Sequence, residues 1–336
     1  MTTESIQVGV LLPTREAVMS GRFETAPLLA LAERVEAAGY ASLWVGDSLL
    51  ARPRFEPLTL LAAVAARTRR CRLGTAVLLP ALRHPLVLAH AVATVDRLAE
   101  GRLVLGVGIA PDSKAVRREF ENAGVPFAQR VGRLVESLAI CRQLWADAGE
   151  RPVSVQGRYW SLDEARLLPT PARAGGPPVW MGGEVAAATE RAGRLAEGWM
   201  PNSVTPEAWA EGWAPNSVTP EAWAEGWARV LATARAERGG TAHLTPALYT
   251  TLNVGRDART AEAELRKFVE GYYAAPYEAI ARVQGFHAGD AASCLERLQG
   301  FVRAGVRHIV LRFGGGDQAE QLERTTREIV PRLGLP

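Results

Sequence analysis

Eight short apolar runs, rich in β-branched residues, recur along this chain, and helix-like segments separate them. Continuous apolar strands that alternate with helices are typical of a parallel sheet covered by helices on both faces. The first run is followed by apolar positions at helical spacing over Pro27–Ala38, which ends at Gly39. The expected strands are Ile6–Leu12, Ser42–Val45, Arg72–Leu79, Leu103–Val107, Pro178–Met181, Gly198–Met200, Ala247–Val254 and His308–Phe313.

Eight strand–helix units favour an α/β chain folded as a closed (β/α)8 TIM barrel. Loops are inserted between the units, and Val153–Leu162 is expected to form an added hairpin. A doubly wound open sheet is the alternative. Its usual dinucleotide-binding fingerprint is missing, because Gly106-Val-Gly108 continues as Ile-Ala-Pro. We therefore expect residues 1–336 to form a single barrel domain.

A 14-residue segment occurs twice in tandem, at 196–209 and 210–223, with a single difference between the copies. Two short copies do not make a repeat protein, so this is a local duplication after the sixth strand or an error in the gene sequence. Each copy carries a helix-start signal, Thr205-Pro206-Glu207 or Thr219-Pro220-Glu221. Only one can begin the sixth helix, and we expect the other to form a short, partly exposed excursion.

Composition and spacing exclude several classes of function. The 39 basic and 36 acidic residues are interspersed, so no basic stripe indicates nucleic-acid binding. No apolar run is long enough to span a bilayer, and the first residues lack a secretory signal, so we expect a cytoplasmic protein. Its three cysteines and five histidines show no ligand spacing, so no metal site is expected.

In a barrel, the loops after the strands carry the active site, and three of them hold candidate residues. Asp47 ends the second strand, where it is either a hydrogen-bond acceptor for a ligand or a turn residue. His84 lies on the third loop before Pro85, and is either a site residue or an ordinary residue at a helix start. Gly182-Gly183 precedes a helix, and either its N–H groups bind phosphate or it only turns the chain.

Four segments together resemble the luciferase-like monooxygenase superfamily. They are WVGDSLL at 44–50, LGTAVLLPALRHPLVLAHAVATVDRLAEGRLVLGVG at 73–108, REFENAGVPFAQRVGRLVESLAICRQLW at 118–145 and PPVWMGGEVAAATERAGRLAEGWMPNS at 177–203. The run GT-x-V, HP and D-x-L-x-x-GR is the specific part. The resemblance implies a bacterial-luciferase-like TIM barrel that uses reduced FMN or coenzyme F420, and a homodimer.

The resemblance also assigns cofactor-binding residues. It places Thr75, Ala76 and Val77 against the flavin ring, with a cis peptide between Ala76 and Val77. Gly106 and Gly108 leave room for the ring, although strand glycines also serve tight barrel packing. Arg130 matches the family's arginine for the cofactor phosphate, although a surface salt bridge would equally explain it.

Two departures limit what the resemblance implies. Sugar-phosphate dehydrogenases of the superfamily have His after the strand-two Asp and Glu after the GVG run, where this chain has Ser48 and Pro111-Asp112. Luciferases have Arg where this chain has Ile109. Neither of these activities is therefore expected. Glu184 replaces a common serine, so either its carboxylate points away from a bound phosphate or the phosphate binds differently.

The leading hypothesis is a two-component monooxygenase that uses reduced FMN from a separate reductase, together with O₂, on a small organic substrate. The alternative is F420-dependent hydride transfer without O₂. A Schiff-base aldolase is disfavoured, because the only lysines, Lys114 and Lys267, do not end a strand. A non-catalytic flavin-binding relative is a further alternative. Asp47 and His84 are the candidate catalytic residues.

Overall fold

Eight parallel strands close into a barrel in the computed structural model, which describes residues 5–202, 219–282, 284–315 and 317–334. The barrel closes because β8 pairs with β7 on one side and with β9 on the other. The predicted (β/α)8 fold is confirmed. In order around the barrel the strands are β1 (Gln7–Leu11), β2 (Ser42–Val45), β3 (Arg72–Thr75), β4 (Leu103–Val107), β7 (Val179–Met181), β8 (Gly198–Trp199), β9 (Thr245–Val254) and β11 (His308–Phe313).

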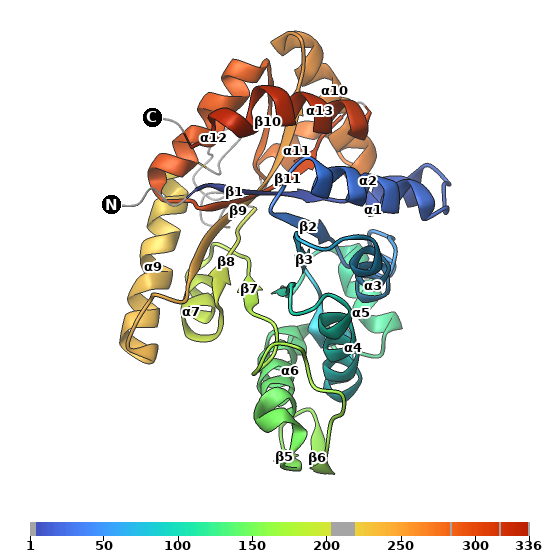
Figure 1. Cartoon of the computed structure of the whole chain (residues 1–336), viewed down its shortest axis with the longest axis vertical. Helices are drawn as coiled ribbons and strands as arrows, with labels where there is room; N and C mark the ends of the chain where they lie inside the picture. The colour runs from blue at the N-terminus through green and yellow to red at the C-terminus, as the bar shows by residue number, and fades with distance from the viewer. Residues whose placement is uncertain (1–4, 203–218, 283, 316, 335–336) are drawn as a thin grey trace.

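Helices follow the strands and cover the outside of the barrel. They are α1 (Thr14–Met19), α2 (Ala26–Ala37), α3 (Pro57–Arg67), α4 (Pro85–Leu98), α5 (Lys114–Asn122), α6 (Arg130–Trp145), α7 (Ala186–Leu195), α9 (Pro220–Arg238), α10 (Ala258–Tyr273), α11 (Tyr277–Ala281), α12 (Ala291–Ala304) and α13 (Gln318–Glu328). The antiparallel hairpin of β5 (Val153–Gln156) and β6 (Ser161–Ala165) lies beside α6 at one end of the molecule (Figure 1). Helices α10, α12 and α13 lie at the opposite end. Within the described ranges every helix is too short or too polar to cross a bilayer.

The structure differs from the sequence prediction at several boundaries. Strand β3 ends at Thr75 instead of Leu79, and beyond it Leu78 makes only an isolated bridge to Val107. The short strand β10 (Phe286–Gly289) was not predicted, and it pairs with the far end of β9 outside the closed barrel. Its four residues alternate poorly in polarity, so their pattern carries little strand signal.

Three large rings fill the barrel interior. Trp44 of β2 and Trp180 of β7 lie with ring centroids 5.2 Å apart, and His308 of β11 packs edge-on against both. All three side chains are fully buried or nearly so. A Cβ atom at Gly74 would overlap Trp44, and one at Gly198 would overlap Trp180, so the neighbouring strands supply glycine where these rings approach.

A hydrogen-bonded chain holds this buried histidine. Trp44 Nε1 donates to Ser42 Oγ at 2.7 Å, and that hydroxyl lies 2.8 Å from His308 Nε2. The hydroxyl accepts from Trp44, and it pairs with Nε2 of the imidazole as donor or acceptor according to the histidine tautomer. Nδ1 has no partner among the described residues. Burial, with a smaller contribution from Arg72, lowers the pKa of His308 to about 3.

The second copy of the duplicated segment begins helix α9. Thr219 caps the helix by accepting from Ala222 N at 3.2 Å, with Pro220 as its first residue. Trp223 and Trp227 of α9 pack their rings on Trp199 of β8, with centroid distances of 5.7 and 6.4 Å. The start signal of the first copy and the expected excursion lie outside the described residues.

We predict that His308 makes the fold sensitive to acid. The folded protein binds the His308 proton only near pH 3, whereas the unfolded chain binds it near pH 6.5, so acid favours unfolding across this window. When the pH is lowered from 6.5 to 5, this residue should lower the free energy of unfolding by about 2 kcal/mol. Urea unfolding at both pH values measures the loss, and His308→Gln should remove most of it.

The exposed His90 of α4 provides the matched control for this prediction. A His90→Gln variant should lose stability with acid as steeply as the wild-type protein. Equal acid sensitivity of His308→Gln and the wild type would contradict the assignment.

Candidate active site

A cavity of about 670 Å³ opens at the C-terminal ends of the barrel strands. This face, which we call the mouth, is where enzymes of this architecture place their chemistry. The cavity lining includes predicted residues that end β2, β3, β4 and β7, namely Asp47, Ala76, Val77, Gly108, Gly182 and Gly183, together with Arg130 of α6. The structure thus brings together seven of the ten residues singled out in the sequence.

One side of the mouth is lined by small residues. We call these residues, Ala76, Val77, Gly108 and Gly182, the slot. Larger side chains do not fit at the two glycines: a Cβ at Gly108 would overlap Val77, and one at Gly182 would meet Met200 O at 3.2 Å. The expected cis peptide between Ala76 and Val77 is present. Such small residues leave room for a flat ring to lie against the barrel wall.

Two of the predicted cofactor residues lie behind the slot instead of lining it. Thr75 is fully buried, and its Oγ1 donates to Gly106 O at 2.7 Å. A Cβ at Gly106 would in turn overlap Thr75 O. This close approach joins β3 to β4, so Thr75 and Gly106 shape the wall on which a ring would lie.

Asp47 lines the cavity, but both its oxygens already have partners. Oδ2 accepts from Leu79 N at 2.9 Å and from Arg83 Nη1, and Oδ1 accepts from Arg83 Nη2 at 3.2 Å. The carboxylate is almost fully buried, with 2% of its side chain exposed. Asp47 therefore ties the loop after β2 to the loop after β3, and its catalytic role stays a prediction.

His84 lies outside the residues that line the cavity. It is the N-cap of α4, where its Nδ1 accepts from Leu86 N at 3.3 Å and its ring packs edge-on against Trp160. This geometry is that of a helix cap, one of the two alternatives that the sequence left open. Among the described residues, its side chain contacts the start of α4 and the Trp160 ring, and it does not line the cavity.

Two arginines lie beside the glycine pair at the start of α7. Arg130 has a buried Nε with no partner in the described part of the chain, and its guanidinium stacks 3.8 Å from the Phe127 ring. Arg191 of α7 also lines the cavity. Burial lowers the pKa of Arg191, and so do the positive charges of Arg194 and Arg130. We call Arg130 and Arg191 the mouth pair.

The mouth pair and the glycines form a favourable anion site. Neither arginine has a carboxylate within salt-bridge distance in the described ranges. The backbone at Gly182-Gly183 leads directly into the N-terminus of α7, whose dipole also favours an anion. The sequence analysis missed Arg191, although it stands one helical turn after Ala188, which also lines the cavity.

The carboxylate of Glu184 is directed toward the end of β8. Its Oε1 accepts from Asn202 N at 3.2 Å. This hydrogen bond joins the loop after β7 to the loop after β8 and accounts for the carboxylate that replaces the family's serine. Both residues line the cavity.

The other side of the mouth carries large polar residues that the sequence analysis missed. Arg312 of β11 is 3% exposed; its Nε donates to Thr251 Oγ1 at 2.9 Å and its Nη1 donates to Tyr273 Oη at 3.1 Å. Tyr249 of β9 and Arg54 of the loop after β2 line the cavity nearby. A lone arginine within the apolar run HIVLRF was the available signal, since strands buried on both faces rarely carry a charge.

Glu119 of α5 fixes the loop after β2. Its Oε1 accepts from Ser48 Oγ and Leu50 N, each at 2.8 Å, and the carboxylate is 1% exposed. Ser48 Oγ also accepts from Arg52 N at 2.8 Å. These hydrogen bonds to Glu119 and Ser48 hold in place the loop that presents Arg54 to the cavity.

This barrel, with a small-residue slot and an adjacent anion site, defines a cofactor-dependent enzyme whose chemistry lies at the mouth. The chain matches the luciferase-like monooxygenase family over residues 6–308, and it belongs to that family. It is therefore an oxidoreductase, of a family that uses flavin or F420. In the described ranges no cluster of three His, Cys, Asp or Glu side chains could hold a metal ion.

Two curated relatives are F420-dependent glucose-6-phosphate dehydrogenases. The protein from Microbacterium testaceum is 32% identical over 329 residues, which cover 94% of this chain and 95% of that protein. The protein from Nakamurella multipartita is 37% identical over 188 residues, so the match spans about half of each chain, 54% and 53%.

A solved monooxygenase from Streptomyces bottropensis superposes with a TM-score of 0.77 at 21% identity, covering 97% of this chain and 99% of that one. At this identity the superposition shows a shared fold. The fold alone therefore does not distinguish oxygenation from hydride transfer.

We predict that Arg191 binds the phosphate of the cofactor. Replacing Arg191 with Gln should weaken cofactor affinity roughly tenfold to a hundredfold, because a charged hydrogen bond is lost. Arg194→Gln, three residues along α7, is the control, since Arg194 is exposed and pairs with Glu237. Fluorescence titration measures both affinities. Equal losses in the two variants would contradict the assignment.

Proposed function

We propose that this chain is an F420-dependent oxidoreductase that transfers a hydride to or from a small alcohol or carbonyl substrate, without O₂. The observation that supports a flat, phosphate-bearing cofactor is the slot beside Arg130 and Arg191, which have no salt-bridge partner in the described part of the chain and of which Arg130 keeps an unpaired Nε. The choice of F420 is supported by the full-length relative at 32% identity, which is F420-dependent. The reduced-FMN monooxygenase that the sequence first favoured thus becomes the second candidate.

The residues at the mouth fit such a cofactor. When bound, F420 exchanges a hydride with a carbon of the substrate. The slot of Ala76, Val77 and Gly108 would hold its ring, and Arg130 and Arg191 would bind its phosphate. The buried Nε of Arg130, which has no partner in the described residues, is the group whose hydrogen bonding a phosphate would complete.

Tyr249 is the group that we assign to proton transfer. The substrate oxygen gains or loses a proton as its carbon exchanges a hydride, so a proton-carrying side chain must reach it. Tyr249 lines the cavity, and its hydroxyl has no hydrogen bond to any described residue. Burial raises the pKa of Tyr249, although Arg312 opposes this, so the phenol stays protonated at neutral pH. It can therefore donate to a carbonyl oxygen.

The acidic groups around the cavity are poorly placed for the same task. Asp47 is paired with Arg83, and Glu119 is bound to Ser48 and backbone N–H groups. Asp112 is half-exposed and paired with Arg117. Each already accepts strong hydrogen bonds, so its oxygens are engaged by the protein itself.

We propose a substrate other than glucose 6-phosphate. The sugar-phosphate dehydrogenases that this chain resembles have His where it has Ser48 and Glu where it has Pro111-Asp112. The Ser48 hydroxyl lines the cavity, but its proton is donated to Glu119 Oε1 at 2.8 Å. A chain with these replacements would need a different proton donor, and Tyr249 fits that need.

Partners follow from this proposal. A hydride-transferring enzyme needs no flavin reductase, whereas the FMN alternative does. A homodimer remains a prediction, which analytical ultracentrifugation would test.

The proposal is tested by binding and turnover with both cofactors. The purified protein should bind F420 at least tenfold more tightly than FMN. It should also reduce F420 with an alcohol substrate in the absence of O₂. Tight binding of reduced FMN with substrate-dependent O₂ consumption, and no affinity for F420, would support the monooxygenase and overturn the proposal.

A second prediction concerns Tyr249. Tyr249→Phe should lower kcat by about a hundredfold to ten-thousandfold, because general-acid catalysis contributes on that scale. F420 affinity should be unchanged. Because the pKa of Tyr249 is raised, carbonyl reduction by the wild type should persist to a pH above the ordinary tyrosine pKa of about 10. A pH profile of kcat that is the same in the variant would contradict the role.

A further inference from the structure

Four arginines gather on the side of the mouth opposite the mouth pair. We call Arg15 of α1, Arg52 and Arg54 of the loop after β2, and Arg312 of β11 the inner arginine cluster. The strands that present it, β11, β1 and β2, are neighbours in the barrel, whereas the mouth pair follows β4 and β7 on the far side. The cavity therefore has a cationic group at each of two opposite sides.

Tyrosine rings and hydroxyl groups hold the inner arginine cluster in place. Arg15 lies 4.8 Å and Arg312 lies 4.6 Å from the centroid of the Tyr272 ring, and Arg54 Nη2 donates to Tyr272 Oη at 3.1 Å. Arg52 lies 4.9 Å from the centroid of the Tyr273 ring. Aromatic rings favour cations but leave their positive charge largely in place.

The cluster lacks compensating negative charge. Within the described ranges none of the four arginines has a carboxylate within salt-bridge distance. Glu16 is the nearby acidic residue, and burial raises its pKa while Arg312 and Arg54 oppose that effect. One carboxylate, disfavoured in its charged form, leaves several positive charges to be balanced in a partly dehydrated cavity.

N–H groups of the inner arginine cluster that have no partner indicate which kind of ligand would balance its positive charges. Arg312 is only 3% exposed, and its Nη2 has no partner in the described residues. Nη1 of Arg15 also has no partner there. Arg54 also lines the cavity, and its Nη1, which lies against Gly46 just after β2, makes no hydrogen bond to a described residue. A planar guanidinium with free N–H groups matches the oxygens of a carboxylate or phosphate.

We infer that the inner arginine cluster binds an oxyanion on the substrate, so the substrate is an alcohol or carbonyl compound that also bears a carboxylate or phosphate group. Arg54 makes the direct contact from the cavity wall, and Arg312 and Arg15 supply charge from behind it. Tyr249 lines the same cavity, where it can reach the substrate oxygen that exchanges a proton. The inference deepens the proposed function, because it names the class of substrate for the same site.

Anion binding is measured first without any cofactor. In the full-length Arg191→Gln protein the mouth pair is weakened, so added oxyanions report on the inner arginine cluster. Inorganic phosphate and succinate, each titrated at constant ionic strength against chloride, should raise the Tm with the logarithm of their concentration once the concentration exceeds Kd. The probe that binds more tightly indicates whether the substrate carries a phosphate or a carboxylate group.

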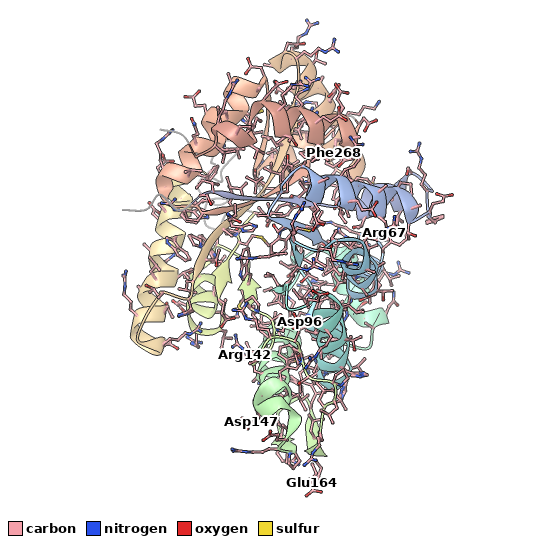
Figure 2. All side chains as sticks on the ribbon, viewed as in Figure 1. Arg67, Asp96, Arg142, Asp147, Glu164 and Phe268 are labelled. Atoms are coloured by element: carbon pink, nitrogen blue, oxygen red, sulfur yellow. The ribbon has the colours of Figure 1, made fainter. Side chains whose placement is uncertain are left out.

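Substitutions at Arg54 identify the site. In the Arg191→Gln background, Arg54→Leu should weaken anion binding roughly tenfold to a hundredfold, and Arg54→Lys should restore part of it because the charge returns. Arg67→Leu is the matched control, since Arg67 is an exposed arginine at the end of α3 (Figure 2). It pairs with Glu33 at 2.6 Å. The Arg67→Leu protein should bind both probes like its parent.

Three outcomes would overturn the inference. The first is that phosphate and succinate act no differently from chloride, and the second is that their effect persists unchanged in Arg54→Leu. If Arg54→Leu weakens F420 binding to the otherwise wild-type protein, the cluster holds the cofactor and not the substrate. Failure of the wild type to bind F420 would sink the proposed function alone, since the anion titration uses no cofactor.

Discussion

The packing of Trp44, Trp180 and His308 inside the barrel is the constraint on which the rest depends. A closed eight-stranded barrel must fill its interior with side chains, and these three rings do so below the mouth. With the interior filled there, the strand ends above can carry residues of very different size. This freedom lets β3, β4 and β7 end in small residues, while β9 and β11 present Tyr249 and Arg312.

The two sides of the mouth consequently carry different kinds of side chains. The slot and the mouth pair offer a flat apolar wall with an anion site, as a phosphate-bearing ring cofactor requires. The opposite side offers arginines that pack on tyrosine rings and that have no carboxylate within salt-bridge distance among the described residues, so their positive charge is left uncompensated. Buried unpaired charge is costly, so an enzyme retains it where a ligand completes the pairing. The two sides therefore suit a cofactor and a charged substrate that face each other.

The sequence predicted the fold better than the site. Continuous apolar strands separated by amphipathic helices specify a barrel, and the glycines of the slot lie at strand ends where a pattern can be read. Arg191, Tyr249 and Arg312 escaped because they are far apart in the chain and meet only through barrel closure. His84 illustrates the reverse: its motif suggested chemistry, but its imidazole caps α4. Local pattern could not show that Asp47 would be paired with Arg83 across two loops.

A crystal structure of the protein with bound F420 tests the central claim most directly. The account predicts that the ring lies against Ala76, Val77 and Gly108, with the phosphate within hydrogen-bond distance of Arg130 or Arg191. The face of the ring away from the slot should then be turned toward Tyr249 and Arg54. A cofactor phosphate bound to Arg54 or Arg312, with the slot empty, would contradict it.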